Sequence, residues 1–423
     1  MSDTKDIKKN VKLFPYYKML SWDLLFYYSI IYLFLLQVKN ISASQILLGD
    51  ALYRLASCIF QIPSGRIISR LGKKNSVILG NICVSIFAFT LMFIRSFSHL
   101  VIIYFILAFG YALKNACEPN ILYDSLPRRK RARGKFFSII DGRGLSGYYY
   151  IDAFTAILSG FLYVINPYIP IALCFIFCLI PTILSFKFEH TADKKQDVPT
   201  LKEYREDIKQ AFKHIKKSQR FKSLILFYAF SAALFYVIIS LRSSFLEEIG
   251  LPEQYFGIVF CIFQILAATS TRMSNKIHNK FKNHTLAVLC LPVAISCIII
   301  GFIGYTKISI VSFIIILILF SIQNMSKGPY NSLTSRYFNN FTNSKVRVRF
   351  HTIKNLAYDL TTIIFSLICS MILNIATAAN TLIIIGCIST AALVLLLDYM
   401  RDKVGLAPEK YDITDTKYES ISK

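Results

Sequence analysis

Charged side chains inside long apolar segments are the residues of this chain with the clearest potential for chemistry. An ionisable group at the centre of a membrane helix costs about 3 kcal/mol on insertion scales, so it is expected to face a polar cavity or a partner. Such a group can bind a polar solute or take up a proton. The first part of the chain contains Asp23, Asp50, Arg54, Lys114, Glu118, Asp141, Arg143 and Asp152, and the second part contains Arg242, Lys327, Lys354 and Asp359.

Two pairs among these residues have the spacing of one helical turn, namely Asp50 with Arg54 and Lys114 with Glu118. Side chains four residues apart share one face of a helix and can form an ion pair. Two interpretations stay open for both pairs. They brace neighbouring helices, or they belong to a site that binds a solute or a proton.

Other candidates have no such local partner. Asp152 has no basic residue four positions away, which makes it the strongest candidate for a carboxylate that titrates, with Glu118 next. Lys327 and Asp359 lie on different segments and form a third candidate pair, again either structural or functional. Uncharged polar residues are cheaper to bury and can hydrogen-bond a solute or another helix; these include Gln264 and Gln323.

The composition of the chain indicates a membrane protein. Of its 423 residues, 55% are hydrophobic and 14% aromatic, and only 17% are charged, against about 25% in ordinary soluble proteins. A disordered chain is excluded because so much apolar surface cannot stay solvated. The apolar residues fall in blocks of about twenty, the length that spans a hydrocarbon core of about 30 Å.

The apolar blocks predict an all-α integral membrane protein with about twelve transmembrane helices in two groups of six, separated by a polar stretch. The spans are expected near Phe14–Gln37, Ile46–Ile68, Asn75–Ile94, Leu100–Tyr123, Phe137–Tyr163, Tyr168–Phe186, Lys222–Leu246, Tyr255–Met273, Thr285–Tyr305, Ser309–Tyr330, Phe350–Leu373 and Leu382–Tyr399. The predicted parts are an N-terminal tail (1–13), a first bundle (14–188), a linker (189–221), a second bundle (222–400) and a C-terminal tail (401–423). Within the linker, Thr200–Lys217 has the periodicity of an amphipathic helix.

The net charge of +24 is better explained by the topology of a membrane protein than by nucleic-acid binding. The basic residues form short clusters between apolar blocks, whereas a nucleic-acid binder gathers them on one soluble face or arm. The clusters follow the even-numbered spans and flank both termini, and positive residues near span ends stay in the cytosol. Both termini are therefore expected in the cytoplasm, with the protein in the plasma membrane.

No cofactor or metal is expected. The ten Cys and six His show no metal-ligand spacing, and there is no Gly-rich Lys-Ser/Thr loop for a nucleotide phosphate. A membrane enzyme that modifies lipids would need clustered His and carboxylates, so this alternative is disfavoured. A third alternative, a sensor that does not transport, is separable from a transporter only by a flux measurement.

The turn between the second and third blocks contains a motif, Pro63-Ser-Gly-Arg-Ile-Ile-Ser-Arg-Leu-Gly-Lys-Lys74. It resembles the signature loop of the major facilitator superfamily, in which a Gly precedes an Asp-Arg pair, a second Gly and two basic residues. The matching positions, with Arg66 beside them, are Gly65, Arg70, Gly72, Lys73 and Lys74. Gly65 would allow close helix packing and Gly72 a tight turn. Where the family has Asp this chain has Ser69, and Asp124 is a candidate substitute.

The resemblance implies a monomeric transporter of small molecules that works by alternating access between two bundles. In that fold the first, fourth, seventh and tenth spans line a central cavity. Asp23, Glu118 and Arg143 would then lie at similar depth, with Lys327 and Asp359 at a comparable depth in the second bundle. Residues 118–126 also resemble a largely bacterial branch described as efflux transporters, although span five lacks the Pro-Gly motif of drug–proton antiporters.

The function predicted from these features is secondary active transport of a small molecule. Proton coupling is favoured because there are buried carboxylates and no nucleotide-binding motif. Export is one direction; an uptake symporter or facilitator of a polar or charged metabolite is the alternative.

Overall fold

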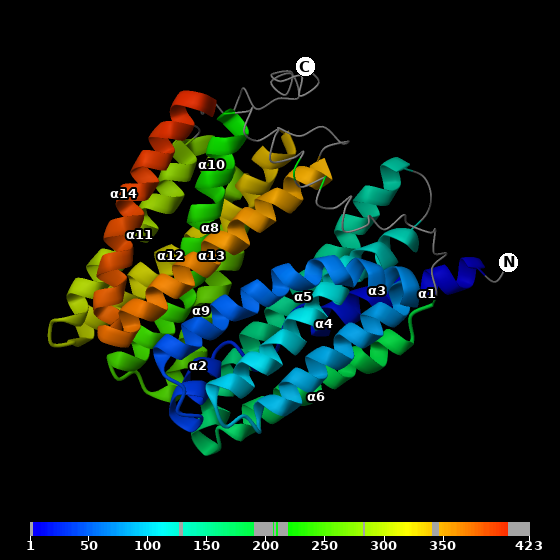
Figure 1. The fold of residues 1–423 in the computed structure, drawn as a ribbon, viewed down its shortest axis with the longest axis horizontal. Coiled ribbons are helices and arrows are strands. Elements are labelled where there is room, and N and C mark those ends of the chain that lie inside the picture. The colour runs from blue at the N-terminus through cyan, green and yellow to red at the C-terminus, as the bar shows by residue number, and fades with distance from the viewer. Residues whose placement is uncertain are drawn as a thin grey trace. The chain divides into compact units, whose positions relative to one another are not determined.

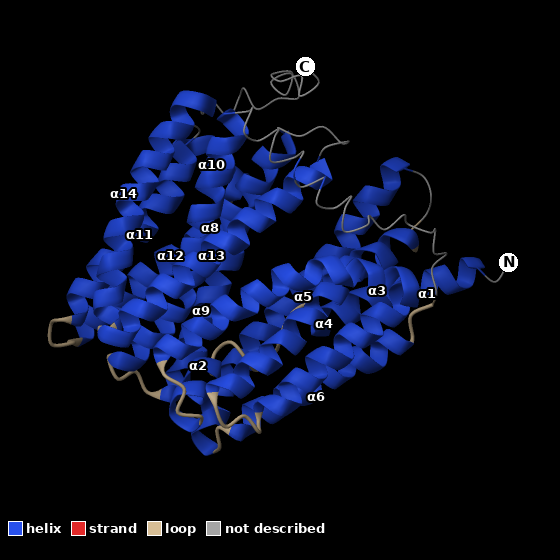
Figure 2. Cartoon of the chain, in the orientation of Figure 1, coloured by secondary structure: helices blue, strands red, loops and turns tan. Residues whose placement is uncertain are grey.

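The computed structural model describes residues 3–126, 130–189, 206, 209, 219–281, 284–340 and 347–404. Within these ranges the chain forms helices joined by short turns and contains no strand (Figure 2). The predicted all-helical fold class is therefore confirmed. The chain divides into two compact units, Met1–Val198 with Pro252–Ile262 and Pro199–Leu251 with Phe263–Lys423.

The first unit is built on long helices, labelled in Figure 1. Helix α3 packs along α4 and α6, and α1 packs against α5 and α6. The elements are α1 (Asp3–Ser21), α2 (Ile31–Leu33), the π-helical turn η1 (Phe34–Val38), α3 (Ala43–Leu91), α4 (Phe97–Asp124), α5 (Lys130–Ile165) and α6 (Tyr168–Phe186).

In the second unit α8 packs against α13 and α14, and α11 packs against α12 and α14. Helix α9 begins in the first unit and continues into the second after Ile262. The elements are α8 (Gln219–Glu248), α9 (Glu253–Arg272), α10 (Ser274–Phe281), α11 (Thr285–Gly304), α12 (Ile310–Asn340), α13 (Arg347–Ile375) and α14 (Ala378–Val404).

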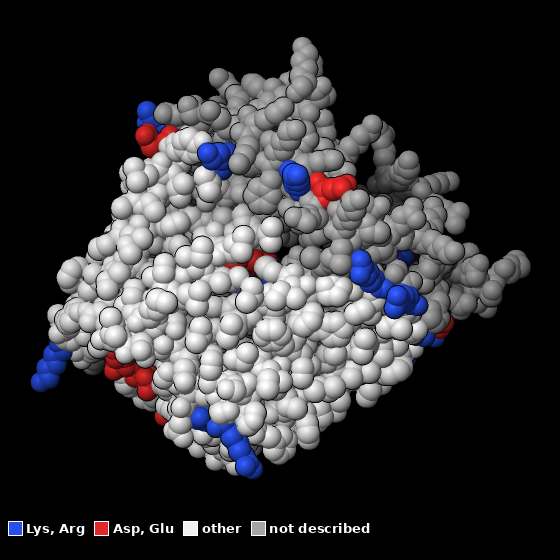
Figure 3. Space-filling view, in the orientation of Figure 1, with Lys and Arg blue, Asp and Glu red and all other residues white. Residues whose placement is uncertain are grey.

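Ten helices of the described residues are long and apolar enough to cross a membrane. Twelve spans were predicted, and the first two are missing from the ten. The first predicted span, Phe14–Gln37, is interrupted, so no continuous apolar helix covers it. The second is the N-terminal part of α3, which carries Asp50, Arg54 and Arg66. On the face shown in Figure 3 most of the described surface is uncharged, as contact with lipid requires.

Local sequence signals explain where α3 begins and bends. Ser42 caps its first turn by accepting a hydrogen bond from the backbone N–H of Gln45, whose side chain accepts one from the Ser42 N–H in return. Gly72 interrupts the helical backbone with φ 77° and ψ 163°, a conformation that strains any residue with a Cβ. The backbone thus kinks at Gly72, the position where a tight turn was predicted.

Helices α3 and α4 cross at a pair of glycines, Gly80 and Gly110. A Cβ added to Gly80 would lie 2.8 Å from the Gly110 carbonyl oxygen and 2.8 Å from Cγ of Lys114. The crossing therefore depends on both positions having no side chain. It also places Lys114 directly beside α3.

The boundaries predicted for the tails and linker are only partly covered by described residues. Helix α1 begins at Asp3, so helix extends through residues predicted as a tail. The amphipathic helix predicted over Thr200–Lys217 lies outside the described residues except for Glu206 and Lys209, both of which are helical. In the predicted C-terminal tail, α14 continues to Val404, and the rest lies outside the described residues.

Candidate functional site

The first predicted span is not one helix. Residues 22–30 form bends and turns between α1 and α2, and Phe26 has a φ of 60°, in the left-handed region. That conformation costs a bulky residue about 1–3 kcal/mol, so the surrounding structure must hold it. Irregular backbone in a membrane segment is tolerated where it is buried in protein or lines a cavity, because its polar groups need partners.

Asp23 lies in this interruption, and its carboxylate is well supplied with donors. Oδ1 accepts hydrogen bonds from the Leu24 N–H at 2.9 Å, the Tyr28 hydroxyl at 2.7 Å and the Tyr111 hydroxyl at 2.8 Å. Tyr111 belongs to α4, so the carboxylate joins the interruption to a second helix. Asp23 therefore acts at least as a connection between the first span and α4.

Lys114 of α4 binds the backbone carbonyl group at the end of α1, where the first span is interrupted. Its Nζ donates to the Ser21 carbonyl oxygen at 2.7 Å and lies 3.9 Å from Oε1 of Glu118. It also lies 5.1 Å from the centre of the Tyr111 ring. The side chain of Lys114 is 2% exposed and that of Glu118 7%, so the predicted Lys114–Glu118 pair is buried. A cation at the C-terminal end of a helix is favourable because it meets the negative end of the dipole.

Glu118 has a second contact from α1. The Tyr17 hydroxyl donates to Oε1 of Glu118 at 2.5 Å, and the Asn81 side-chain amide of α3 donates to the Tyr17 oxygen at 2.8 Å. Glu118 thus contacts α1 directly and α3 through Tyr17.

A further buried cation, Lys18, lies next to this group. Lys18 of α1 pairs with Asp141 of α5, and its Nζ lies 4.7 Å from the centre of the Trp22 ring. Lys18 also acts electrostatically on Glu118. The candidate site of the first unit is therefore a network of charges and hydroxyls around Asp23, Lys114 and Glu118, positioned by α1, α3, α4 and α5.

At the signature loop, Lys73 donates to Oδ2 of Asp124 at 2.8 Å. The candidate substitute for the missing loop acid thus contacts one of the two basic residues that follow Gly72. The remaining loop residues lie in α3, with Arg66 and Arg70 exposed and Gly65 and Lys74 half-buried. Ser69 is helical. Whether this contact controls a conformational change stays a prediction.

Four further predicted site residues of the first unit lie on α3 and α5. Arg143, expected at a depth similar to that of Asp23 and Glu118, has an exposed side chain on α5. Asp50 and Arg54 are half-buried on α3. Asp152 is 6% exposed on α5, within electrostatic range of Tyr148 and Tyr149. Their functional roles stay predictions.

In the second unit two buried cations lie over aromatic rings. The guanidinium carbon of Arg242 is 4.7 Å from the centre of the Phe263 ring, and Nζ of Lys354 is 4.4 Å from that of Tyr228. Gln323 donates to the Ser296 hydroxyl at 2.9 Å, which makes it a contact between α12 and α11. Of the other predicted residues, Asp359 is buried on α13, and Gln264 of α9 and Lys327 of α12 are half-buried.

Several residues of the network were not predicted from the sequence: Tyr17, Lys18, Asn81 and Tyr111. None of them stands out from its neighbours in the sequence by type, and none lies at a regular helical spacing from its hydrogen-bond partner. Tyr17 and Lys18 precede the interruption that exposes the Ser21 carbonyl. An unusually polar first span is the signal that could have drawn attention to them.

The described residues contain no group of three His, Cys, Asp or Glu side chains that could hold a metal ion. Apolar helices, an interrupted first span and buried charges together define a helical membrane protein of the transporter class.

Comparison with known proteins identifies the family. The model of the Major Facilitator Superfamily matches residues 19–357. The chain belongs to this superfamily, and it is a transporter of the general secondary-transporter kind. No curated protein matches the chain by sequence.

Solved structures with the same fold support this assignment at low sequence identity. The nucleoside transporter NupG is 12% identical, with a TM-score of 0.72 over 94% of this chain and 99% of that one. A D-xylose–proton symporter is 14% identical, with a TM-score of 0.65 over 95% of each chain. The xylose transporter XylE from E. coli, in an inward-open conformation, is 15% identical, with a TM-score of 0.59 over 95% and 99%.

Proposed function

We propose that this protein moves a small polar solute across the plasma membrane by alternating access, driven by a proton gradient. Glu118 is the residue that takes up the proton. The observation that carries the proposal is the position of Glu118, a buried carboxylate 3.9 Å from Lys114 and bonded to Tyr17 beside an interrupted membrane helix. In this proposal the protein is a monomer in the lipid bilayer, with both termini in the cytoplasm, and it performs no enzymatic reaction.

The chemistry of the network supports proton coupling. Protonation of Glu118 removes the charge that Lys114 faces, so the attraction between them weakens. Lys114 also holds the end of α1 through the Ser21 carbonyl. A change of charge at Glu118 is thereby transmitted to the interrupted helix. Discontinuous helices are common at the substrate and ion sites of transporters.

The fold relatives are consistent with this mechanism. One of them is named as a proton symporter for D-xylose. Uptake symport and proton-driven export use the same linkage between proton and solute, and they differ in which side releases the solute. The direction of transport is therefore an outcome of the test.

The test has two stages. Untargeted comparison of solutes in cells with and without the protein identifies the substrate, and purified protein in liposomes then transports that solute under a pH gradient imposed in each direction. Accumulation should follow the gradient and collapse when an uncoupler dissipates it. Equal accumulation with and without the gradient would contradict proton coupling.

Glu118→Gln is the decisive variant in this assay. It removes the titrating group while keeping the hydrogen-bonding shape, so gradient-driven accumulation should fall at least tenfold while solute exchange across the membrane continues. Glu189→Gln is the matched control, because the Glu189 carboxylate also pairs with a lysine, Lys9, but its side chain is 35% exposed. Full accumulation by Glu118→Gln would remove Glu118 from the mechanism.

Asp152 is a second candidate for coupling, because its carboxylate is 6% exposed. Asp152→Asn should reduce gradient-driven accumulation more than exchange. Normal gradient-dependent transport by this variant would exclude Asp152 and leave Glu118 as the proton site.

A further inference from the structure

Three side chains from three helices form a continuous chain of hydrogen bonds in the first unit. The Asn81 amide nitrogen of α3 donates to the Tyr17 hydroxyl oxygen of α1 at 2.8 Å. The same hydroxyl donates to Oε1 of Glu118 on α4 at 2.5 Å. Asn81 is 2% exposed, Tyr17 0% and Glu118 6%, so the chain is closed to bulk water.

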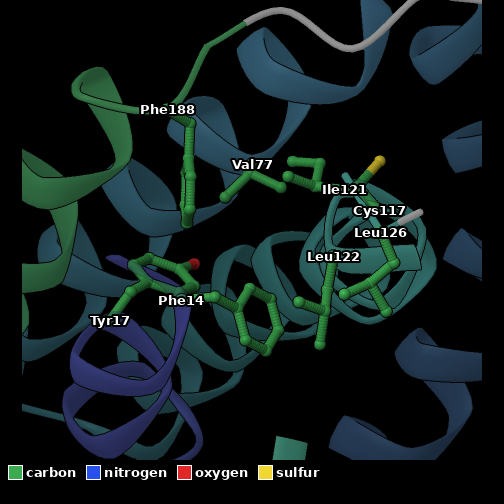
Figure 4. Packing of buried hydrophobic residues seen from close by; sticks show 8 residues of the cluster. All are labelled: Phe14, Tyr17, Val77, Cys117, Ile121, Leu122, Leu126 and Phe188. Atoms are coloured by element: carbon green, nitrogen blue, oxygen red, sulfur yellow. The ribbon is translucent and has the colours of Figure 1, made fainter. Parts of the chain in front are cut away.

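Packing fixes the position of the central oxygen. The Tyr17 ring lies in an apolar cluster with Phe14, Val77 and Leu122 (Figure 4). The edge of the Phe188 ring meets it at a centroid distance of 4.9 Å and an interplanar angle of 73°. Because the ring cannot move freely, the only easy motion of Tyr17 is rotation of its hydroxyl hydrogen.

A hydroxyl has one proton to donate, and this sets the direction of the whole chain. When Asn81 presents its NH₂ group, the Tyr17 oxygen accepts and its proton is directed to Glu118, which must be an acceptor. That arrangement suits the ionised carboxylate. When the Asn81 amide turns by half a rotation, its oxygen accepts the Tyr17 proton, and the Tyr17 oxygen then accepts from a protonated Glu118.

We propose that Asn81 and Tyr17 are positioning residues that allow Glu118 to bind and release a proton without losing its hydrogen bond to α1. The amide orientation of Asn81 and the protonation state of Glu118 change together. The chain of bonds persists in both states and reverses its direction. This inference rests on the proposed role of Glu118 in proton coupling.

The other charged groups that act on Glu118 are Lys114 of its own helix, Lys18 of α1 and Asp141 of α5. Substitution of Asn81 leaves all three in place. These three charges are therefore constant when the hydrogen-bond chain is altered at Asn81 or Tyr17. The distance of 3.9 Å to Lys114 is also longer than the bond to Tyr17, so Tyr17 is the closer partner.

The test uses the full-length protein in lipid nanodiscs and needs no substrate. Infrared difference spectroscopy across a pH titration follows the carbonyl stretch of protonated carboxylic acids, and Glu118→Gln identifies the Glu118 band by its loss. Asn81→Asp keeps the size of the side chain but accepts the Tyr17 proton when ionised. Glu118 then loses its donor and also faces an added negative charge, so its band should reach half-intensity about one to two pH units higher.

Tyr17→Phe removes the donor itself and should move the midpoint in the same direction, since the ionised form loses a hydrogen bond. Tyr330→Phe is the matched control, because it deletes another fully buried hydroxyl, in the second unit, and should leave the midpoint unchanged. The double variant Asn81→Asp with Glu118→Gln separates the band of the introduced carboxyl group from that of Glu118. Because Tyr17→Phe adds no charge, an upward shift in this variant separates loss of the donor from repulsion by the introduced carboxylate. If Tyr17→Phe does not fold, an unchanged midpoint in Asn81→Asp still overturns the inference.

Two negative results are distinguishable. If no band disappears in Glu118→Gln, Glu118 does not titrate, and the proposed coupling function fails. If Glu118 titrates but its midpoint in Asn81→Asp stays within a few tenths of a unit of the wild type, the hydrogen-bond chain plays no part and this inference is overturned.

Discussion

Lys114 in the first unit lies 3.9 Å from the carboxylate of Glu118. The guanidinium carbon of Arg242 in the second unit lies 4.7 Å from the centre of the Phe263 ring. The first membrane segment is interrupted over residues 22–30, whereas α8 of the second unit is continuous from Gln219 to Glu248. The first contact thus pairs a buried cation with a carboxylate beside an interrupted segment, and the second places a buried cation of a continuous helix over an aromatic ring.

This difference separates contacts that respond to protons from contacts that do not. An ion pair weakens when its carboxylate takes up a proton, while a cation over a phenylalanine ring has no titrating partner in that contact. The Lys114–Glu118 contact is therefore suited to sensing a proton. The Arg242–Phe263 contact is suited to holding α8 against α9 unchanged.

The largest effect on stability is expected from Lys114→Ala. It leaves the buried Glu118 carboxylate and the Ser21 carbonyl without their cation, so the free energy of unfolding should fall by about 3–5 kcal/mol. Thermal unfolding of the purified protein in detergent measures the loss.

The double variant Lys114→Met with Glu118→Met serves as its control. Removing both charges should restore most of the free energy of unfolding, because no unpaired charge stays buried. Proton-driven transport should be lost in the double variant, because it lacks the Glu118 carboxylate. Stability as low as that of Lys114→Ala would mean that the pair is not the reason for the loss.

Gly80→Ala should have the next largest effect. The new Cβ would lie 2.8 Å from the Gly110 carbonyl oxygen and from Lys114 Cγ, so α3 and α4 must move apart. The expected loss is about 1–3 kcal/mol, together with slower transport because Lys114 is displaced. Gly142→Ala is the matched control on α5, since nothing lies within 4 Å of its added Cβ. Equal behaviour of the two variants would show that the crossing tolerates a side chain.

Phe263→Leu probes the second unit. The loss of ring and cation contact should lower the free energy of unfolding by about 1–2 kcal/mol and leave the pH dependence of transport unchanged. Phe320→Leu, at a neighbouring buried ring 6.3 Å away, controls for lost volume. A shifted pH profile in Phe263→Leu would contradict the division of roles between the units.

Asp124→Asn should have the smallest effect on stability. The Asp124 carboxylate is 35% exposed, so loss of its bond to Lys73 should cost no more than about 1 kcal/mol. The rate of transport should change more than stability if the contact holds one conformation closed. Adding Ser69→Asp, which supplies the acid found in the family, should then recover part of the wild-type rate. An unchanged rate in Asp124→Asn would exclude the contact from gating.

Much of the fold could be predicted from local features. Composition and apolar block length indicated a helical membrane protein, and the Gly72 motif indicated the family to which the chain belongs. The four-residue spacing of Lys114 and Glu118 correctly placed them on one helix face. These predictions succeed because hydropathy and helical spacing are properties of neighbouring residues.

The interruption at residues 22–30 could not be predicted in this way. Phe14–Gln37 is apolar enough to be read as one span, and no Pro or Gly lies between 22 and 30 to mark the break. Asp23 was found as a charged residue in a span, but its location in a non-helical segment was not. Arg143 was grouped with it by span position, and that grouping stays a prediction.

Local sequence therefore accounts for the membrane character of the chain, most of its helices and the buried Lys114–Glu118 pair. Helix packing accounts for the partners of those charges. Tyr17 and Glu118 are separated by 101 positions and Asn81 and Tyr17 by 64, so neither contact has a signature in nearby residues. Hydrogen bonds and ion pairs act over a few ångströms, and only the folded arrangement of α1, α3 and α4 brings these groups within that range.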